Sequence, residues 1–267
     1  MIHIIPKPTD TQYDNSTGMV IEELTRLGAN FDKISIDKLD IFNIPYSGDI
    51  IWVCGIKQDG FQFELLKSLS LTNRVVNSPE SIANCASKAT TSTILVNAGI
   101  STPDTCFTND ISVVDDFLNI HNGCAIYKPV YGFDGNGIYM FNSIDQIKEP
   151  RPYYVQEYIK NDRDYRVFVI GNKAVGAIKR ESSHLTHNIH QGGHGMAISL
   201  TDEIKSIAES AAMAMNIDYC GVDLLPTEDG GYTVLEINGT PNWHCMDAPI
   251  PTILAKYLVE QDQLTKK

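Results

Sequence analysis

The chain has 267 residues, of which 43% are hydrophobic and 20% charged, so it is long enough to bury a full core and form two or three subdomains. Its net charge of −12 argues against nucleic acid or an anionic membrane as a partner. No apolar run reaches the roughly 18 residues of a membrane span, and residues 1–6 carry no charged leader before an apolar core. We therefore expect a cytoplasmic protein, and homo-oligomer formation stays open.

The first part of the chain alternates between strand patterns and amphipathic helix patterns. Strands are predicted at 3–5, 49–55 and 74–77, and helices at 18–27 and 62–71. This β-α-β alternation predicts a small parallel sheet. The segment 6–17, rich in Pro, Thr, Asp and Asn, should form a loop at the carboxyl end of the first strand. Such loops face ligand crevices in open α/β sheets, although a plain surface loop is equally consistent with the composition.

A helix is predicted next, with Ser78 as its cap and Pro79 in its first turn, running to about Ala98 and ended by Gly99. Later elements are predicted as a helix at 202–215, with Thr201 as its cap, and a closing helix at 250–261.

A glycine-rich hairpin is predicted between the strands 125–130 and 138–141. The glycines of its loop, Gly132, Gly135 and Gly137, allow backbone N–H groups to approach an anion without interference from a Cβ atom. The loop fits neither the Rossmann nor the Walker pattern, so we interpret it as a flap over phosphates; an ordinary hairpin turn is the alternative. Lys128 lies among apolar neighbours and needs an anionic partner, which an ATP phosphate would supply.

A strand at 153–159 contains Gln156, Glu157 and Tyr158 and breaks into the charged turn 160–164. Residues 165–180 then predict a hairpin that turns at Gly171 and Asn172. Arg166 and Arg180 lie on opposite arms of this hairpin and could converge across it. Paired arginines are common on protein surfaces, but beside a metal–phosphate site they would neutralise a transferring phosphoryl group.

Three oxygen-bearing side chains occur in the apolar runs 219–225 and 234–238. Glu236 and Asn238 are two residues apart and therefore face the same side of a strand. The turn 226–231 would pair this strand with the one that carries Asp223. Hard oxygen ligands without His or Cys suit Mg²⁺. The alternative is that these residues face water at a sheet edge.

In their order along the chain, Lys88, the Lys128–Pro129 pair, the glycine loop, the strand around Gln156 and the two hairpins resemble the ATP-grasp superfamily, and within it the RimK-like glutamate ligases. The similarity runs from about Asn77 to Pro241. It implies a mixed α/β (α+β) ATP-grasp fold: an N-terminal parallel-sheet domain at 1–77, a central lid subdomain at 78–159, and a C-terminal catalytic subdomain with an antiparallel sheet at 160–267.

The resemblance also implies a role for each matching residue. Lys88 and Lys128 would contact ATP phosphates, Glu157 and Tyr158 would meet the adenine largely through backbone groups, and Asp164 would bind the ribose. Gln156 would also belong to the nucleotide site. Asn188 matches an asparagine that precedes the paired glycines of the family, and it would contact the nucleotide. Catalytic roles fall to Arg166, Arg180 and Lys128, and the metal ligands would be Asp223, Glu236 and Asn238, holding Mg²⁺ or alternatively Mn²⁺.

The implied function is an ATP-dependent carboxylate–amine ligase that forms an amide bond through an acyl-phosphate, with an amino acid such as glutamate as one substrate. The other substrate could be a small molecule or a protein tail. Thr186, Gln191 and the segment 238–242 depart from the family pattern where the substrate would lie, so they leave the ATP chemistry in place and the substrate open. The alternatives are a small-molecule kinase of the same fold and an ATP-binding regulator without turnover.

Two groups of reactive side chains remain. The six cysteines show no CxxC spacing and are interpreted as reduced thiols. The histidines at 184, 187, 190 and 194 lie in a glycine-rich loop whose spacing does not match a helical zinc site. An active-site loop and an ordinary polar loop are both consistent with this pattern. His244 and Cys245 are adjacent, which favours loop packing over a catalytic pair.

Overall fold

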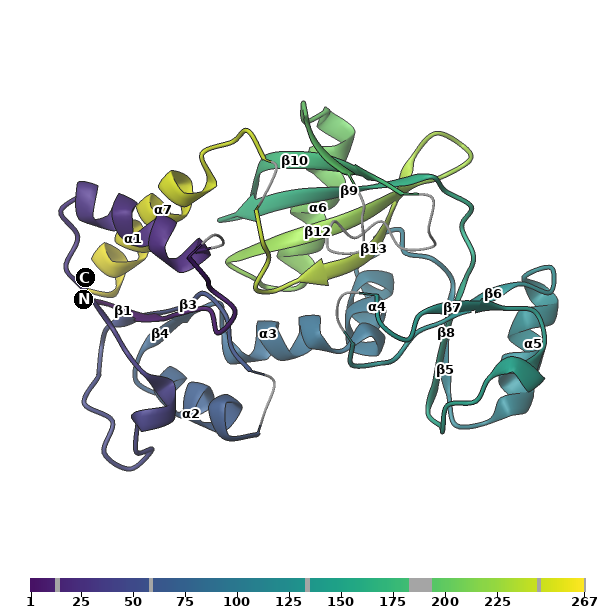
Figure 1. Ribbon diagram of the computed structural model, residues 1–267, viewed down its shortest axis with the longest axis horizontal. Coiled ribbons are helices and arrows are strands. Elements are labelled where there is room, and N and C mark those ends of the chain that lie inside the picture. The colour runs from purple at the N-terminus through teal and green to yellow at the C-terminus, as the bar shows by residue number, and fades with distance from the viewer. Residues whose placement is uncertain (13–14, 58–59, 133–134, 183–193, 244–245, 267) are drawn as a thin grey trace.

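The computed structural model describes residues 1–12, 15–57, 60–132, 135–182, 194–243 and 246–266. Three sheets follow one another along an elongated molecule, and the sheets of the first and second thirds of the chain lie at opposite ends (Figure 1). Within the described ranges, no helix is both long and apolar enough to cross a bilayer. The predicted mixed α/β architecture is confirmed: the first sheet is parallel, and the second and third are antiparallel.

The first sheet has the strand order β2-β1-β3-β4 and is parallel throughout. Its elements are β1 (Ile2–Ile5), α1 (Ser16–Arg26), β2 (Phe31–Lys33), β3 (Ile50–Val53), α2 (Gly60–Ser70) and β4 (Arg74–Val76). The strand and helix predictions are confirmed for all of these except β2. That strand has only three residues, none of them buried, and so lacks the apolar run that marks its neighbours.

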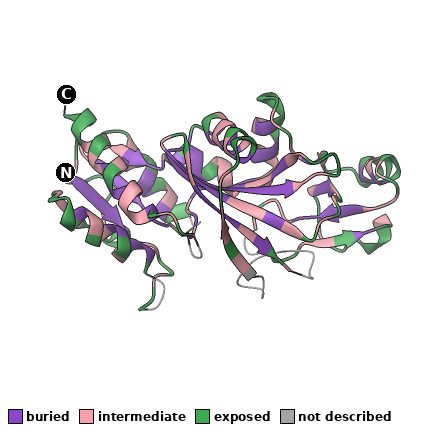
Figure 2. Ribbon diagram, turned by 90° about the horizontal axis from the view of Figure 1, so that it is seen from above, coloured by how far each residue is buried: buried purple, intermediate pink, exposed green. Residues whose placement is uncertain are grey.

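Helices cover both faces of this sheet. One face packs against α1 and against α7 (Ile250–Thr265), while the other packs against α2. The side chains of Ile4, Trp52 and Leu254 meet in the first of these cores and are fully buried. The purple strands in Figure 2 show the same buried layer between partly exposed helices. The segment from 250 to 265 therefore completes a core that the first 76 residues begin.

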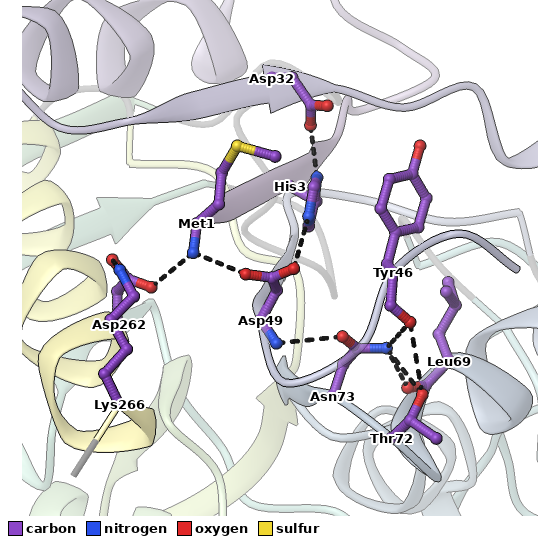
Figure 3. A network of polar contacts seen from close by, with 10 residues as sticks. All are labelled: Met1, His3, Asp32, Tyr46, Asp49, Leu69, Thr72, Asn73, Asp262 and Lys266. Carbon is purple, nitrogen blue, oxygen red and sulfur yellow. Dashed lines mark hydrogen bonds and ion pairs between the residues drawn. The ribbon is translucent and has the colours of Figure 1, made fainter.

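A polar network ties α7 to the N-terminal ends of the central strands β1 and β3 (Figure 3). The α-amino group of Met1 donates to Asp49 at 2.7 Å and to Asp262 of α7 at 2.9 Å. The imidazole of His3 is 1% exposed and lies between Asp32, at 2.6 Å from Nδ1, and Asp49, at 3.2 Å from Nε2. These carboxylates satisfy both ring nitrogens of a buried histidine.

The helix predicted from Ser78 to Ala98 is wrong as a single element. The structure has two helices, α3 (Pro79–Ala86) and α4 (Lys88–Asn97), with Ser87 between them in an extended conformation (φ −100°, ψ 109°). The Ser87 side chain accepts a hydrogen bond from the backbone N–H of Thr90 and so caps α4. The break makes Lys88 the first residue of a new helix.

The second sheet has the order β5-β8-β6-β7 and is antiparallel. It consists of β5 (Thr105–Thr108), β6 (Ala125–Tyr127), β7 (Tyr139–Phe141) and β8 (Tyr153–Glu157). The predicted hairpin between 125 and 141 is confirmed. One face packs on α5 (Ile111–Ile120) through residues such as Val114, Leu118 and Val155, so Ile126, Lys128 and Gln156 lie on the opposite face.

The third sheet has the order β11-β10-β9-β12-β13 and pairs antiparallel. Its elements are β9 (Arg163–Ile170), β10 (Lys173–Glu181), β11 (His194–Ile198), α6 (Asp202–Ala214), β12 (Tyr219–Pro226) and β13 (Tyr232–Asn238). Both predicted hairpins and the helix capped by Thr201 are confirmed. Helix α6 packs on one face, and Phe168 and Tyr219 on the other face join the core of the first sheet.

Candidate active site

A pocket lies between the second and third sheets. Residues from both sheets line it. They include nine of the predicted site residues: Lys128, Gly135, Gln156, Glu157, Tyr158, Asp164, Arg180, Asp223 and Glu236. The structure therefore brings together in one cavity side chains that are up to about a hundred residues apart in sequence.

The lid side of the pocket holds a buried lysine. Lys128 is 8% exposed, and its Nζ donates to Oε1 of Gln156 at 2.5 Å. Burial lowers the pKa of Lys128 to about 8, and the nearby charge of Lys88 adds to this, while Glu236 opposes it. Its partner in the protein is thus a neutral amide, which leaves the ammonium group available to an anionic ligand.

The second lysine links the glycine loop to the metal-ligand strand. Lys88, at the start of α4, donates to the carbonyl of Gly132 at 3.2 Å and lies 3.5 Å from Oε2 of Glu236. The glycines at 135 and 137 have φ values of 72° and 73°, in the left-handed region that side chains disfavour. A Cβ atom at Gly137 would also lie 3.0 Å from Cγ of Pro129. The loop therefore depends on glycine for its conformation.

Two arginines converge on one carboxylate at the floor of the pocket. The pairing of β9 with β12 places Arg166 opposite Asp223, and the two side chains form a bidentate pair at 2.7 Å for each bond. Arg180 from β10 reaches the same carboxylate at 2.9 Å and also binds Asp164 at 2.6 and 2.8 Å. The predicted convergence of Arg166 and Arg180 is confirmed. Although burial alone would raise the pKa of Asp223, the two guanidinium groups hold it well below its usual value.

The three predicted metal ligands lie together across the β12–β13 hairpin. Asp223 pairs with Glu236 in the strand register, and Nδ2 of Asn238 lies 3.5 Å from Oδ2 of Asp223 and 3.4 Å from Oε1 of Glu236. Two carboxylates and one amide within this distance are a donor set that fits Mg²⁺. The side chain of Glu236 is 35% exposed, so it is also open to the pocket.

Of the remaining predicted residues, some lie at the pocket and others lie outside the part of the chain that the structure describes. Glu157 and Tyr158 lie at the end of β8 and line the pocket, while both carboxylate oxygens of Asp164 are bound by Arg180. Asn188 lies outside the described residues, as do His184, His187, His190, His244 and Cys245. The other cysteines, Cys54, Cys85, Cys106, Cys124 and Cys220, carry free thiols.

Sequence reasoning missed the apolar walls of the pocket. Pro103, Ile126, Ile138, Ile159, Leu225 and Leu235 line it beside the polar residues. Strand alternation offered a signal for two of them, because Ile126 is two residues before Lys128 and Leu225 is two after Asp223. The others come from loops or from the opposite parity of a strand, which periodicity alone does not assign.

The comparisons with known proteins fit this geometry. The family model of the RimK-like ATP-grasp domain matches residues 85–261, which is most of the chain. The chain belongs to the RimK-like ATP-grasp family. It is accordingly an ATP-dependent ligase that forms C–N bonds.

Several proteins named as ligases or synthases are similar in sequence. The tetrahydromethanopterin:alpha-L-glutamate ligase of Methanocaldococcus jannaschii is 31% identical over 217 residues, covering 75% of this chain and 74% of the relative. The corresponding ligase of Methanosarcina acetivorans is 32% identical, with 68% of each chain covered. Human beta-citrylglutamate synthase B is 28% identical, and the match covers 73% of this chain and 56% of that protein.

Solved structures share the ATP-grasp fold over nearly the whole chain. The ligase PsnB, complexed with a variant of its minimal precursor, Mg and ADP, superposes with a TM-score of 0.77 at 21% identity and covers 98% of both chains. The macrocyclase MdnC from Microcystis aeruginosa, bound to its precursor peptide, gives a TM-score of 0.74 at 16% identity, covering 98% of this chain and 100% of that one. At sequence identities of 21% and 16%, the similarity to these structures shows a shared fold and no more.

Proposed function

We propose that this ligase joins the amino group of glutamate to a carboxylate on a second substrate, through an acyl-phosphate. The observation that carries the proposal is the single pocket in which Lys128, Arg180, Asp223 and Glu236 meet. Relatives with the same domain are named as glutamate ligases or as synthases of glutamate conjugates, which favours glutamate as the amine. The second substrate is a small-molecule carboxylate or the carboxylate of a protein tail.

In the proposed first step, an oxygen of the substrate carboxylate attacks the γ-phosphorus of ATP and ADP leaves. Lys88 and Lys128 hold the phosphates, the end of β8 at Glu157 and Tyr158 holds the adenine, and Asp164 lies toward the ribose. In this proposal Gly132, Gly135 and Gly137 would lie over the phosphates and exclude water, which would otherwise hydrolyse the acyl-phosphate.

Asp223, Glu236 and Asn238 would hold Mg²⁺, or Mn²⁺ in its place, as their oxygen-rich set suggests. The ion would supply positive charge beside the transferring phosphoryl group. In the second step, the amine attacks the acyl carbon and phosphate leaves. Arg166 and Arg180, which already share one carboxylate in the protein, would stabilise the oxyanion formed there.

The test is nucleotide release by the purified protein with Mg-ATP, glutamate and a panel of mono-, di- and tricarboxylates. We expect ADP and phosphate to appear only when glutamate and a carboxylate are both present, together with an amide detectable by mass spectrometry. Release that requires a different amine would reject glutamate, and AMP with pyrophosphate would reject the acyl-phosphate. ADP formation that depends on an alcohol would indicate a kinase, and nucleotide binding without turnover would indicate a regulator.

Two variants show whether any turnover comes from the proposed site. Glu236→Gln removes a charged ligand from the half-exposed end of the metal set, and we expect it to abolish magnesium-dependent turnover without unfolding the protein. Glu228→Gln is the matched control, because Glu228 lies exposed in the turn of the same β12–β13 hairpin. Full activity of the first variant would contradict the metal assignment.

A further inference from the structure

A network of buried hydrogen bonds leads from Lys128, one of the two lysines proposed to hold ATP phosphates, to α4, the helix that begins with the other, Lys88. It begins at Lys128, whose Nζ donates to Oε1 of Gln156 at 2.5 Å. The amide nitrogen of Gln156 donates to Oγ1 of Thr105 at 3.1 Å and to the hydroxyl of Tyr154 at 3.4 Å. The Tyr154 hydroxyl in turn lies 2.8 Å from Oγ of Ser92.

Ser92 belongs to α4, the helix whose first residue is Lys88. The two residues are four apart, so one turn of helix separates the end of the hydrogen-bond chain from the second lysine. Two backbone contacts fix the same region, since the N–H of Lys88 donates to the carbonyl of Val130 and the N–H of Lys128 donates to the carbonyl of Tyr154. Helix α4 and strands β6 and β8 are thus connected through polar groups as well as by packing.

The side chains of this hydrogen-bond network are buried, and the direction of the Gln156 amide is determined by its partners. Tyr154 is 2% exposed, Gln156 1% and Ser92 6%. Neither Tyr154 nor Ser92 is among the residues that line the pocket, so neither hydroxyl is placed to contact a ligand there. Lys128 donates only and therefore selects the carbonyl end of the Gln156 amide, which directs the NH₂ end toward Thr105 and Tyr154. A buried polar network in which each member finds a partner fixes one arrangement of its elements.

We propose that Ser92 and Tyr154 are positioning residues that, through Gln156, set Lys128 and Lys88 at the separation required to hold the ATP phosphates. The proposal rests on the proposed function, in which these lysines bind phosphate. Its consequence is selective: loss of either hydroxyl weakens the binding of the phosphate groups and leaves the binding of the nucleoside unchanged.

The variants Tyr154→Phe and Ser92→Ala each remove one hydroxyl from the chain. We expect the Kd of the Mg complex of a non-hydrolysable ATP analogue, measured by calorimetry, to rise about three- to tenfold in each, as expected for one hydrogen bond. The Kd of adenosine, measured by competition, should not change. Because both variants break the same contact, the double variant should bind no more weakly than the weaker single variant.

Matched controls exist beside each position. Tyr153→Phe changes the neighbouring tyrosine on β8, which packs on the opposite face of the sheet. Thr93→Ala removes an exposed hydroxyl from the same helix. Both should bind the analogue like the wild type, and thermal unfolding of each sample shows that the compared proteins are folded.

The possible results distinguish a failure of the proposed phosphate site from a failure of the positioning role of Ser92 and Tyr154. A wild-type protein that binds adenosine and the ATP analogue equally well would reject the proposed phosphate site itself. Wild-type preference for the analogue, with unchanged affinity in Tyr154→Phe and Ser92→Ala, would leave the proposed function standing and reject the positioning role. Equal weakening of adenosine and the analogue would also reject it, because that result indicates general distortion of the pocket.

Discussion

Lys128 differs from the charged groups around Asp223 in having a neutral partner. The arginines and carboxylates around Asp223 neutralise one another, whereas the ammonium group of Lys128 is hydrogen-bonded to the amide of Gln156. Burial of this ammonium group is costly, and its pKa falls to about 8 as a result. A bound polyphosphate would favour the charged form, so nucleotide binding and protonation of Lys128 should be coupled.

This coupling predicts a pH dependence. Below about pH 8 Lys128 is already charged in the free protein, so nucleotide affinity should be constant there. Above that pH the free protein carries neutral Lys128 and must take up a proton on binding, so the Kd should rise, by up to about tenfold per pH unit. Calorimetry with a non-hydrolysable ATP analogue from pH 7 to pH 9.5 measures this.

Lys128→Arg provides the control, because a guanidinium group stays charged throughout this range. Its nucleotide affinity, whatever its absolute value, should lose the dependence above pH 8. A wild-type Kd that is independent of pH up to 9.5 would show that Lys128 does not contact the phosphates.

At the scale of elements, the break between α3 and α4 sets the direction of Lys88. Ser78 caps α3 through the N–H of Ser81, and Ser87 caps α4 through the N–H of Thr90. The two serines thus perform the same local task on consecutive helices, but only the second helix begins with a residue of the proposed phosphate site.

We therefore expect Ser78→Ala and Ser87→Ala to lower the free energy of unfolding by a similar amount, about 1 kcal/mol each. Only Ser87→Ala should also weaken nucleotide binding, because fraying of the first turn of α4 releases Lys88. Denaturant unfolding and analogue binding, measured on both variants, make the comparison. Equal nucleotide affinities in the two variants would show that the cap of α4 does not position Lys88.

Elements whose pattern lies within one short stretch of the sequence could be predicted from the sequence alone. The β12–β13 hairpin combines apolar strands with a turn at 226–231, and Asp223, Glu236 and Asn238 could be assigned to one face by strand parity. Helix α5 was not predicted although Asp110 accepts a hydrogen bond from the N–H of Ser112 as its cap and Val114 and Leu118 are buried four residues apart. A capping residue and apolar residues at helical spacing are both visible in the sequence, so α5 could have been predicted from it.

Other features depend on tertiary contacts that no local pattern contains. No glycine or proline occurs from residue 80 to residue 97, so the sequence offered no strong breaker to end the helix at Ser87. The hydroxyls of Ser92 and Tyr154 are 62 residues apart and meet only because α4 packs against β8. Likewise, the pairing of both arginines with Asp223 required the strand register of β9, β10 and β12.

At the scale of the whole molecule, Tyr219 connects the first sheet to the third. Its hydroxyl donates to the carbonyl of Val53 at 2.6 Å and accepts from Nε1 of Trp52 at 3.2 Å. The ring is 1% exposed and is stacked with Phe168. Tyr219, Trp52 and Val53 are not among the residues that line the pocket, so this contact serves the joint between the two sheets.

Tyr219→Phe should lower the free energy of unfolding by about 1–3 kcal/mol, because the substitution leaves two buried polar groups without their partner. Nucleotide affinity should be unchanged. Tyr131→Phe, at a position that is 71% exposed, is a suitable control and should not alter stability. Denaturant unfolding monitored by fluorescence gives both values, and equal stability of Tyr219→Phe and the wild type would show that the hydroxyl does not hold the sheets together.

The packing of α7 against the first sheet has a consequence for synthesis of the protein on the ribosome. Ile4, Leu24 and Trp52 emerge early, but Ile250, Leu254 and Leu258, which cover them, are translated only after the whole catalytic sheet. Until then one apolar face of the nascent sheet is exposed, and it is a natural binding surface for chaperones. The parallel sheet would thus be translated well before α7 but would reach its native core only after α7 has been made, and ligase activity would await that step.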